Sequence, residues 1–156
     1  MTGYEIRRAL PEDTKSCARV VFGALLEYGI EPEPEGADRD VFAIGRRGGR
    51  FVDLVAVAGE AGEVVGVGCL EPWDMGGWIS KLFLASRARG LGLGRGLLDA
   101  LIQEARRGGM THLGLRTRTV FREAVALYEA VGFTRDGLPP QRGAGEDCSF
   151  RLDLSR

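Results

Sequence analysis

Residues 87–96 hold the feature that most restricts the fold, because four glycines alternate there with larger side chains. The segment lies between an apolar run and a leucine-rich helical pattern, and its glycines are Gly90, Gly92, Gly94 and Gly96. A glycine backbone adopts positive φ and can approach a ligand closely. The first N–H groups of a helix lack partners within it, and the helix dipole favours an anion there. The segment therefore predicts a phosphate-binding turn, with close packing of the helix on the sheet as the alternative reason for the glycines.

Two other phosphate-binding motifs do not match this segment. A Walker A loop requires GxxxxGK[ST], and no lysine follows any of these glycines. A dinucleotide fingerprint requires GxGxxG, whereas Gly92 and Gly94 are followed by a glycine at 96, one residue too early. A nucleotide-binding domain that uses the same turn stays open as a less favoured function.

Hydrophobic periodicity around the turn predicts an α/β (α+β) fold, in which helices pack on a mixed, mostly antiparallel sheet. We expect six to seven strands, near residues 4–6, 51–58, 64–70, 78–84, 113–117, 133 and 147–154. We expect about four helices, near residues 14–28, 40–45, 92–107 and 121–131. A looser turn is expected at 72–77. The 156 residues contain no internal repeat and no long linker, so we expect a single domain over 1–156.

Composition argues against several classes of protein. A net charge of −1 provides no overall field for nucleic acid or an anionic membrane. The three cysteines form no CxxC pair and His112 is the single histidine, so we expect neither a disulfide framework nor a metal site. No N-terminal apolar segment and no apolar run of about 20 residues is present, and a cytoplasmic protein is the expectation.

Three motifs resemble the GNAT superfamily of N-acetyltransferases. Arg89-x-x-Gly92-x-Gly94 is similar to the (Q/R)xxGx(G/A) signature of that family. The run from Ala124 through Tyr128 to Phe133 resembles its A-x-x-x-Y-x-x-x-G-F ending, and residues 6–13 resemble its usual start. The resemblance covers essentially the whole chain. It implies a GNAT-like fold whose sheet is splayed at the central strands, the one at 82–84 and the one at 113–117.

The resemblance also implies that acetyl-CoA (coenzyme A) is the co-substrate and that no metal takes part. The residues implied to bind its pyrophosphate are Arg89, Gly90, Leu91, Gly92, Leu93, Gly94 and Arg95. The strand residues implied to pair with the pantetheine arm are Leu82, Phe83 and Leu84. One position departs from the family, because Phe121 stands where an asparagine is common. Phe121 could pack on the pantetheine instead, and Arg122 could reach a phosphate.

The implied reaction is acetyl transfer to a primary amine of a small molecule or peptide by direct attack in a ternary complex. Tyr128 occupies the position of the family's general acid, although its spacing alone fits a core tyrosine. The N–H of Leu84 could polarise the thioester carbonyl. Glu71 is the candidate general base, acting through water, although a solvated turn carboxylate is an equal alternative. Asp74 and Glu27 are weaker candidates for this role.

The acceptor site is expected around Tyr28 and Trp73. Further candidates there are Glu31, Glu33, Glu35 and Trp78, and acidic residues would favour a cationic amine. A solvated loop is the alternative interpretation of the acidic segment. We expect no nucleic-acid or membrane partner, and a homodimer stays open. The alternative function is a non-catalytic acyl-CoA-binding sensor.

Overall fold

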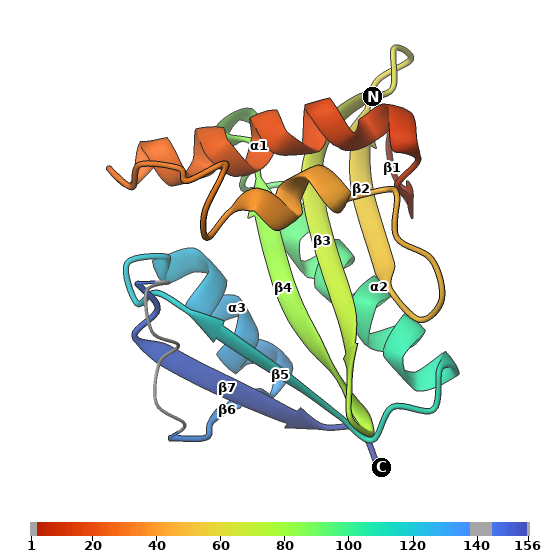
Figure 1. Cartoon of the computed structure of the whole chain (residues 1–156), viewed down its shortest axis with the longest axis vertical. Coiled ribbons are helices and arrows are strands. Elements are labelled where there is room, and N and C mark those ends of the chain that lie inside the picture. The colour runs from red at the N-terminus through yellow and green to blue at the C-terminus, as the bar shows by residue number, and fades with distance from the viewer. Residues whose placement is uncertain (1–2, 138–144, 156) are drawn as a thin grey trace.

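The computed structural model of the chain describes residues 3–137 and 145–155. Within these ranges seven strands form one sheet in the order β1-β2-β3-β4-β5-β7-β6 (Figure 1). The strands are β1 Tyr4–Arg8, β2 Val52–Ala58, β3 Glu63–Trp73, β4 Gly76–Leu84, β5 His112–Thr117, β6 Thr134–Arg135 and β7 Cys148–Asp153. Neighbouring strands are antiparallel except β4 and β5, which run parallel. The mixed, mostly antiparallel sheet predicted from periodicity is confirmed.

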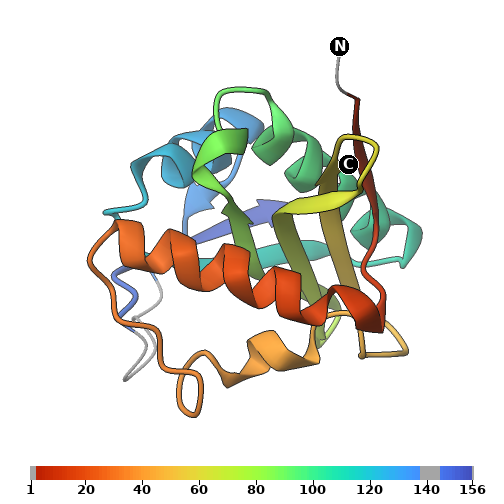
Figure 2. The ribbon, with the colours of Figure 1, turned by 90° about the horizontal axis from the view of Figure 1, so that it is seen from above.

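Helices cover both faces of the sheet (Figures 1 and 2). The α-helices are α1 Thr14–Glu27, α2 Leu93–Arg107 and α3 Arg122–Val131, and the short 3-10 helices are η1 Pro11–Asp13, η2 Arg39–Ala43 and η3 Ser86–Ala88. α1 and η2 lie on one face, and α2 and α3 lie on the other (Figure 2). The helix expected at 40–45 is thus a 3-10 turn, and the described residues contain three α-helices rather than about four.

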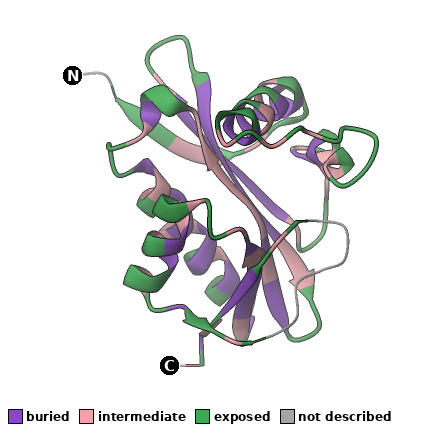
Figure 3. Ribbon diagram, turned by 90° about the vertical axis from the view of Figure 1, so that its left-hand side faces the viewer, coloured by how far each residue is buried: buried purple, intermediate pink, exposed green. Residues whose placement is uncertain are grey.

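Each helical layer buries its own apolar cluster against the sheet, and the strands between them are the most buried part of the chain (Figure 3). On the α1 face, Val21 packs with Val55 and Val67. On the opposite face, Leu97 and Leu101 of α2 belong to the larger cluster. Side chains of one strand point alternately to the two faces, which explains how one strand serves both clusters.

The β3–β4 hairpin is tighter than the sequence indicated. β3 continues to Trp73 and β4 begins at Gly76, so only two residues form the turn that was expected over 72–77. Asp74 has φ +53°, a conformation that aspartate tolerates in turns. A Cβ on Gly76 would lie 2.5 Å from the carbonyl oxygen of His112, so β4 needs glycine where it meets β5. The two strands therefore join closely at this one end.

Beyond that junction β4 and β5 separate, as the family resemblance implied. They pair only at Gly77 with Leu113 and at Trp78 with Gly114, and Figure 1 shows them diverging from there. The edge of β4 from residue 79 to 84 that faces β5 therefore has no ladder on that side. On the other side, Leu70 pairs with Ile79 while the preceding residue of β3 pairs with Lys81, which leaves Ser80 as a bulge.

Candidate active site

A cavity of about 400 Å³ lies where β4 and β5 separate. Its walls come from α1 and the loop that follows, residues 79–84 of β4, the glycine turn, residues 116–118 and α3. The cavity runs along β4 for five residue steps, which is roughly 16 Å in an extended strand. One end is thus formed by the glycine turn, and the other, deep end is formed by the strands near their junction.

The glycine turn presents backbone to the cavity. Gly90 and Gly92 have φ of +77° and +80°, and a Cβ on either would meet no atom within 4 Å. Gly92 is the N-cap of α2, no side chain caps this helix end, and the amide of Gly96 makes the first hydrogen bond back to the Gly92 carbonyl. The intervening N–H groups of 93–95 have no helical partner. Open space beside uncapped amides is the environment that a diphosphate fits.

The two arginines of the turn already have carboxylate partners. Arg89 forms an ion pair of 2.6 Å with Glu27 and donates to the Leu84 carbonyl at 3.2 Å. Arg95 pairs with Asp99 one helical turn later, at 3.1 Å. Both arginines line the cavity. In the described part of the chain, the groups without a partner at this end are therefore mainly backbone amides, while Arg89 holds the turn against the end of α1.

The wall of the cavity contains the strand residues expected beside the pantetheine arm. Leu82 and Leu84 pack toward the α2 and α3 face, and Phe83 packs toward the α1 face. Phe121 also lines the cavity, with its ring 5.8 Å from that of Phe83 and 5.0 Å from that of Tyr28. These three aromatic rings form an apolar side of the cavity. Tyr28 therefore lies with the predicted cofactor residues.

Tyr128 lines the same cavity from α3 and is 4% exposed. Its ring centroid lies 5.6 Å from that of Phe133 and 6.1 Å from that of Phe150. Burial raises the pKa of its phenol well above the usual value, so the group stays protonated at neutral pH. The tyrosine is both a core side chain and a cavity wall, and the two interpretations of its spacing are compatible.

Four of the predicted site residues do not line the cavity. Leu91 is 53% exposed, Arg122 is exposed on α3, and Trp73 is 64% exposed at the hairpin. Glu71 is the fourth. Its role as the general base and the binding roles of the other three residues stay predictions. The rest of the predicted set does line the cavity: Tyr28, Leu82, Phe83, Leu84, Arg89, Gly90, Gly92, Leu93, Gly94, Arg95, Phe121 and Tyr128.

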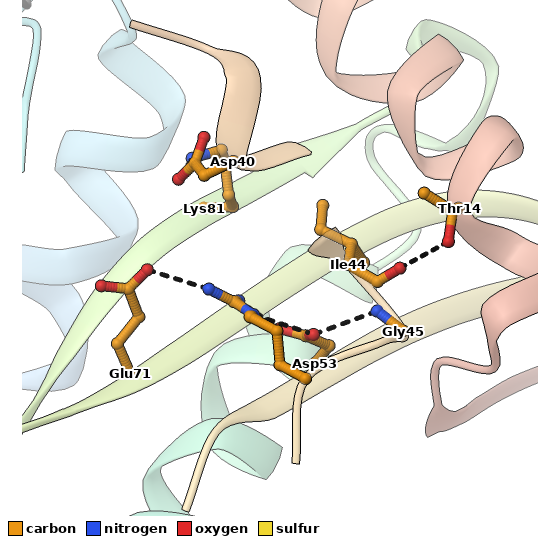
Figure 4. A network of polar contacts seen from close by, with 8 residues as sticks. Thr14, Asp40, Ile44, Gly45, Asp53, Glu71 and Lys81 are labelled. Carbon is orange, nitrogen blue, oxygen red and sulfur yellow. Dashed lines mark hydrogen bonds and ion pairs between the residues drawn. The ribbon is translucent and has the colours of Figure 1, made fainter. Parts of the chain in front are cut away.

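Glu71 belongs to a polar network on the α1 face (Figure 4). Its carboxylate accepts from Arg47 at 3.0 Å, and Arg47 also pairs with the buried Asp53 at 2.5 Å. Asp53 accepts from the amide of Gly45 at 3.0 Å, and the Thr14 hydroxyl nearby donates to the carbonyl of Ile44 at 2.7 Å. These contacts tie the segment after η2 to the sheet. The carboxylate of Glu71 is thus already bound within the protein.

Polar side chains at the deep end were not predicted as site residues. Ser80, Lys81, Arg116 and Glu146 all line the cavity. Ser80 Oγ, Arg116 Nε and Glu146 Oε1 are buried and have no hydrogen-bond partner among the described residues. Lys81 pairs with Asp40 at 2.8 Å (Figure 4). Burial raises the pKa of Glu146, while the charges of Arg116, Arg118 and Lys81 oppose that rise. No local motif marks these residues, because they come together only through strand pairing.

Over residues 3–137 and 145–155, no group of three or more His, Cys, Asp or Glu side chains is placed to hold a metal ion. None of the helices described there is long and apolar enough to cross a membrane. The cysteines at 17, 69 and 148 are buried and free.

The sequence is similar to a known protein family and to individual acetyltransferases. The model of the Acetyltransferase (GNAT) family matches residues 18–133. An IAA acetyltransferase of Azospirillum brasilense is 36% identical over 83 residues, which is 52% of this chain and about half (54%) of that relative's length. The uncharacterized N-acetyltransferase YjgM of Escherichia coli (strain K12) is 28% identical over 158 residues, covering 94% of this chain and 92% of the relative.

A solved structure shares the fold over nearly the whole chain. The acetyltransferase of the GNAT family from Staphylococcus aureus Mu50 has a TM-score of 0.87 and 18% identity, and covers 97% of this chain and 99% of its own. At that identity the likeness extends to the fold alone.

Proposed function

This chain belongs to the acetyltransferase (GNAT) family, and from its cavity we infer that it transfers the acetyl group of acetyl-CoA to a primary amine of a small molecule or peptide. The family uses acetyl-CoA. One observation carries the proposal for this chain: a single cavity has uncapped helix amides at one end, a free strand edge along its wall and a protonated tyrosine beside it.

The described residues fit the co-substrate in two ways. The glycine turn would hold the diphosphate, since it offers open space and N–H groups at the positive end of α2. The free edge of β4 would hold the pantetheine arm. The amide groups of that arm can form hydrogen bonds with the unpaired backbone of β4, as an added peptide strand would. Phe83 and Phe121 would pack on the methylene groups of that arm.

Acetyl-CoA supplies an acetyl group that is already activated as a thioester. The residues of the chain then have two tasks. The β4 edge and the cavity walls position the acceptor nitrogen and exclude water, and positioning of this kind supplies a large part of such rate enhancements. Tyr128 holds a proton at its phenolic oxygen, which a departing thiolate requires. A backbone N–H on the free edge, with Leu84 as our candidate, can polarise the carbonyl oxygen.

Two measurements test this proposal. Titration calorimetry with acetyl-CoA should show binding, with competition by coenzyme A and none by ATP or NADP. A thiol-release assay over a panel of amines should then show turnover. Binding without release for every amine, and no effect of Tyr128→Phe, would favour an acyl-CoA sensor instead. Competition by ATP or NADP but not by coenzyme A would favour a nucleotide-binding domain.

A further inference from the structure

The deep end of the cavity holds two opposite charges that do not meet each other. Arg116 lies near the end of β5, and Glu146 lies just before β7. Nε of Arg116 and Oε1 of Glu146 are buried without a hydrogen-bond partner, and in the described part of the chain no ion pair joins the two side chains. A buried charged group without a partner costs folding free energy. Such a pair is therefore the expected form of a site that a ligand completes.

A ring contact holds the side chain of Arg116, and hydrogen bonds of the next residue hold the backbone beside Glu146. The guanidinium of Arg116 lies 5.2 Å from the ring centroid of Trp78, at the point where β4 and β5 still pair. Glu146 is fixed through its neighbour Asp147, whose amide donates to the Thr117 carbonyl at 3.0 Å and whose carboxylate accepts from the amide and hydroxyl of Thr119. The backbone positions of the two residues are thus fixed by β5 and by its contacts with the segment just before β7.

The other charged side chains near the deep end differ from Arg116 and Glu146 in their contacts or their position. Lys81 of β4 is neutralised by Asp40 at 2.8 Å. Arg118 also lines the cavity and adds positive potential beside Glu146. Asp38, from the loop after α1, lines the cavity and accepts from the amide of Glu33 at 2.8 Å. The acidic side chains at 31, 33 and 35, which favoured a purely cationic acceptor, do not line the cavity.

Building on the acetyl transfer proposed above, we propose that the acceptor is an amine that also carries a carboxylate, with its nitrogen at Glu146 and its carboxylate at Arg116. A simple alkylamine would leave Nε of Arg116 without a hydrogen-bond partner, and a simple carboxylate would leave Oε1 of Glu146 without one. A planar guanidinium suits a carboxylate because both oxygens can accept parallel hydrogen bonds. An amino acid or a carboxylate-bearing amine of similar size satisfies both groups.

The same position lets Glu146 act as the proton acceptor. An acceptor bound as an ammonium first gives one proton to Oε1 of Glu146, which frees the nitrogen lone pair to bond to the acetyl carbon. As the bond between that carbon and sulfur breaks, the sulfur takes the proton of Tyr128, and the tyrosine regains a proton from the new amide nitrogen. Glu146 then releases its proton to solvent. Burial of Glu146 favours this role, since it raises the pKa of the carboxyl group. The geometry favours Glu146 over Glu71, whose carboxylate is bound to Arg47 away from the cavity.

A panel of matched amines tests the carboxylate. Each amino acid, from glycine to 6-aminohexanoate and including aromatic ones, is compared with its carboxamide and its decarboxylated amine by thiol release. We expect kcat/KM to favour the best carboxylate by at least about 30-fold over its carboxamide. Arg116→Gln should abolish that preference, so that kcat/KM for the carboxylate no longer exceeds kcat/KM for its carboxamide. Arg135→Gln is the control, since Arg135 also stacks on a ring, Phe150 at 5.1 Å, but lies outside the cavity.

A second variant and a binding measurement separate recognition from loss of the fold. In Glu146→Gln we expect kcat/KM to fall about 100-fold and the rise of activity with pH through the pKa of Glu146 to disappear. Glu129→Gln, exposed on α3, is the control. With coenzyme A bound, calorimetry should show the N-acetyl carboxylate binding more tightly than the N-acetyl carboxamide, and Arg116→Gln should equalise them.

The outcomes distinguish the two proposals. Should the protein not bind acetyl-CoA at all, the acetyltransferase proposal fails and this inference fails with it. Should it bind and turn over acetyl-CoA but acetylate the carboxamides or the decarboxylated amines as well as their carboxylate counterparts, only the inference about the acceptor is overturned. Binding of acetyl-CoA without turnover of any amine would overturn this inference and would also count against the acetyltransferase proposal. Unchanged preference in Arg116→Gln would overturn it too.

Discussion

The two ends of the cavity differ in which polar groups they leave without a partner. At the glycine turn the side-chain charges are already paired, Arg89 with Glu27 and Arg95 with Asp99, and the groups left open are backbone amides. At the deep end β5 is paired with β7, and the side-chain atoms left without a partner among the described residues include Nε of Arg116 and Oε1 of Glu146. We therefore expect ligand binding at the glycine turn to be most sensitive to added side chains that fill its space. At the deep end we expect it to be most sensitive to the loss of side-chain atoms.

The largest effect should come from filling the glycine turn. Gly92→Glu places a side chain at φ +80° and a carboxylate where the diphosphate would sit, so we expect acetyl-CoA binding to weaken at least about 100-fold. Calorimetry measures this. Gly59→Glu is the matched control, because Gly59 also has φ +70° and open space but lies in the β2–β3 turn. Equal losses in the two variants would show that strain, and not blockage of the turn, is responsible.

The next effect concerns Tyr128, which lies between the two ends. Tyr128→Phe keeps the ring that packs on Phe133 and Phe150 but removes the hydroxyl proton. We expect kcat to fall about 100-fold while the Kd for acetyl-CoA stays within about twofold. Steady-state kinetics and calorimetry on the same preparation check this. A loss of binding in place of turnover would make the tyrosine a packing residue alone.

A smaller effect is expected at Glu71, and it sharpens the contrast with Glu146. Glu71→Gln keeps an acceptor for Arg47 and leaves the cavity unaltered, so we expect kcat/KM to change by less than about threefold. The pH profile should keep its shape. A fall as large as that expected for Glu146→Gln would assign the base to Glu71.

The smallest effect should come from an arginine of the glycine turn. Arg89→Gln removes a partly exposed side chain whose charge is shared with Glu27, and such pairs contribute little. We expect the Kd for acetyl-CoA to rise no more than about twofold, as measured by calorimetry. A loss approaching that of Gly92→Glu would mean that the arginine, and not the backbone, carries recognition at this end.

Sequence could indicate one end of the cavity better than the other for a physical reason. The glycine turn and α2 are encoded by neighbouring residues, so spacing alone placed Gly92 at a helix start. Glu71 was placed by the strand before it, but β3 continues to Trp73, and Arg47, 24 residues earlier, binds its carboxylate. Arg116 and Glu146 are brought together by the β5–β7 register, which no local pattern encodes. Contacts between distant segments place Arg116 and Glu146 in the cavity wall, and no sequence spacing indicates such contacts.

The most direct test of the account is a crystal structure of the protein with coenzyme A. We predict that the diphosphate lies within hydrogen-bond distance of the amides of residues 92–95 and that the pantetheine arm runs along the free edge of β4, between that strand and β5. A diphosphate bound elsewhere, or an arm that leaves the β4 edge open, would contradict the central claim.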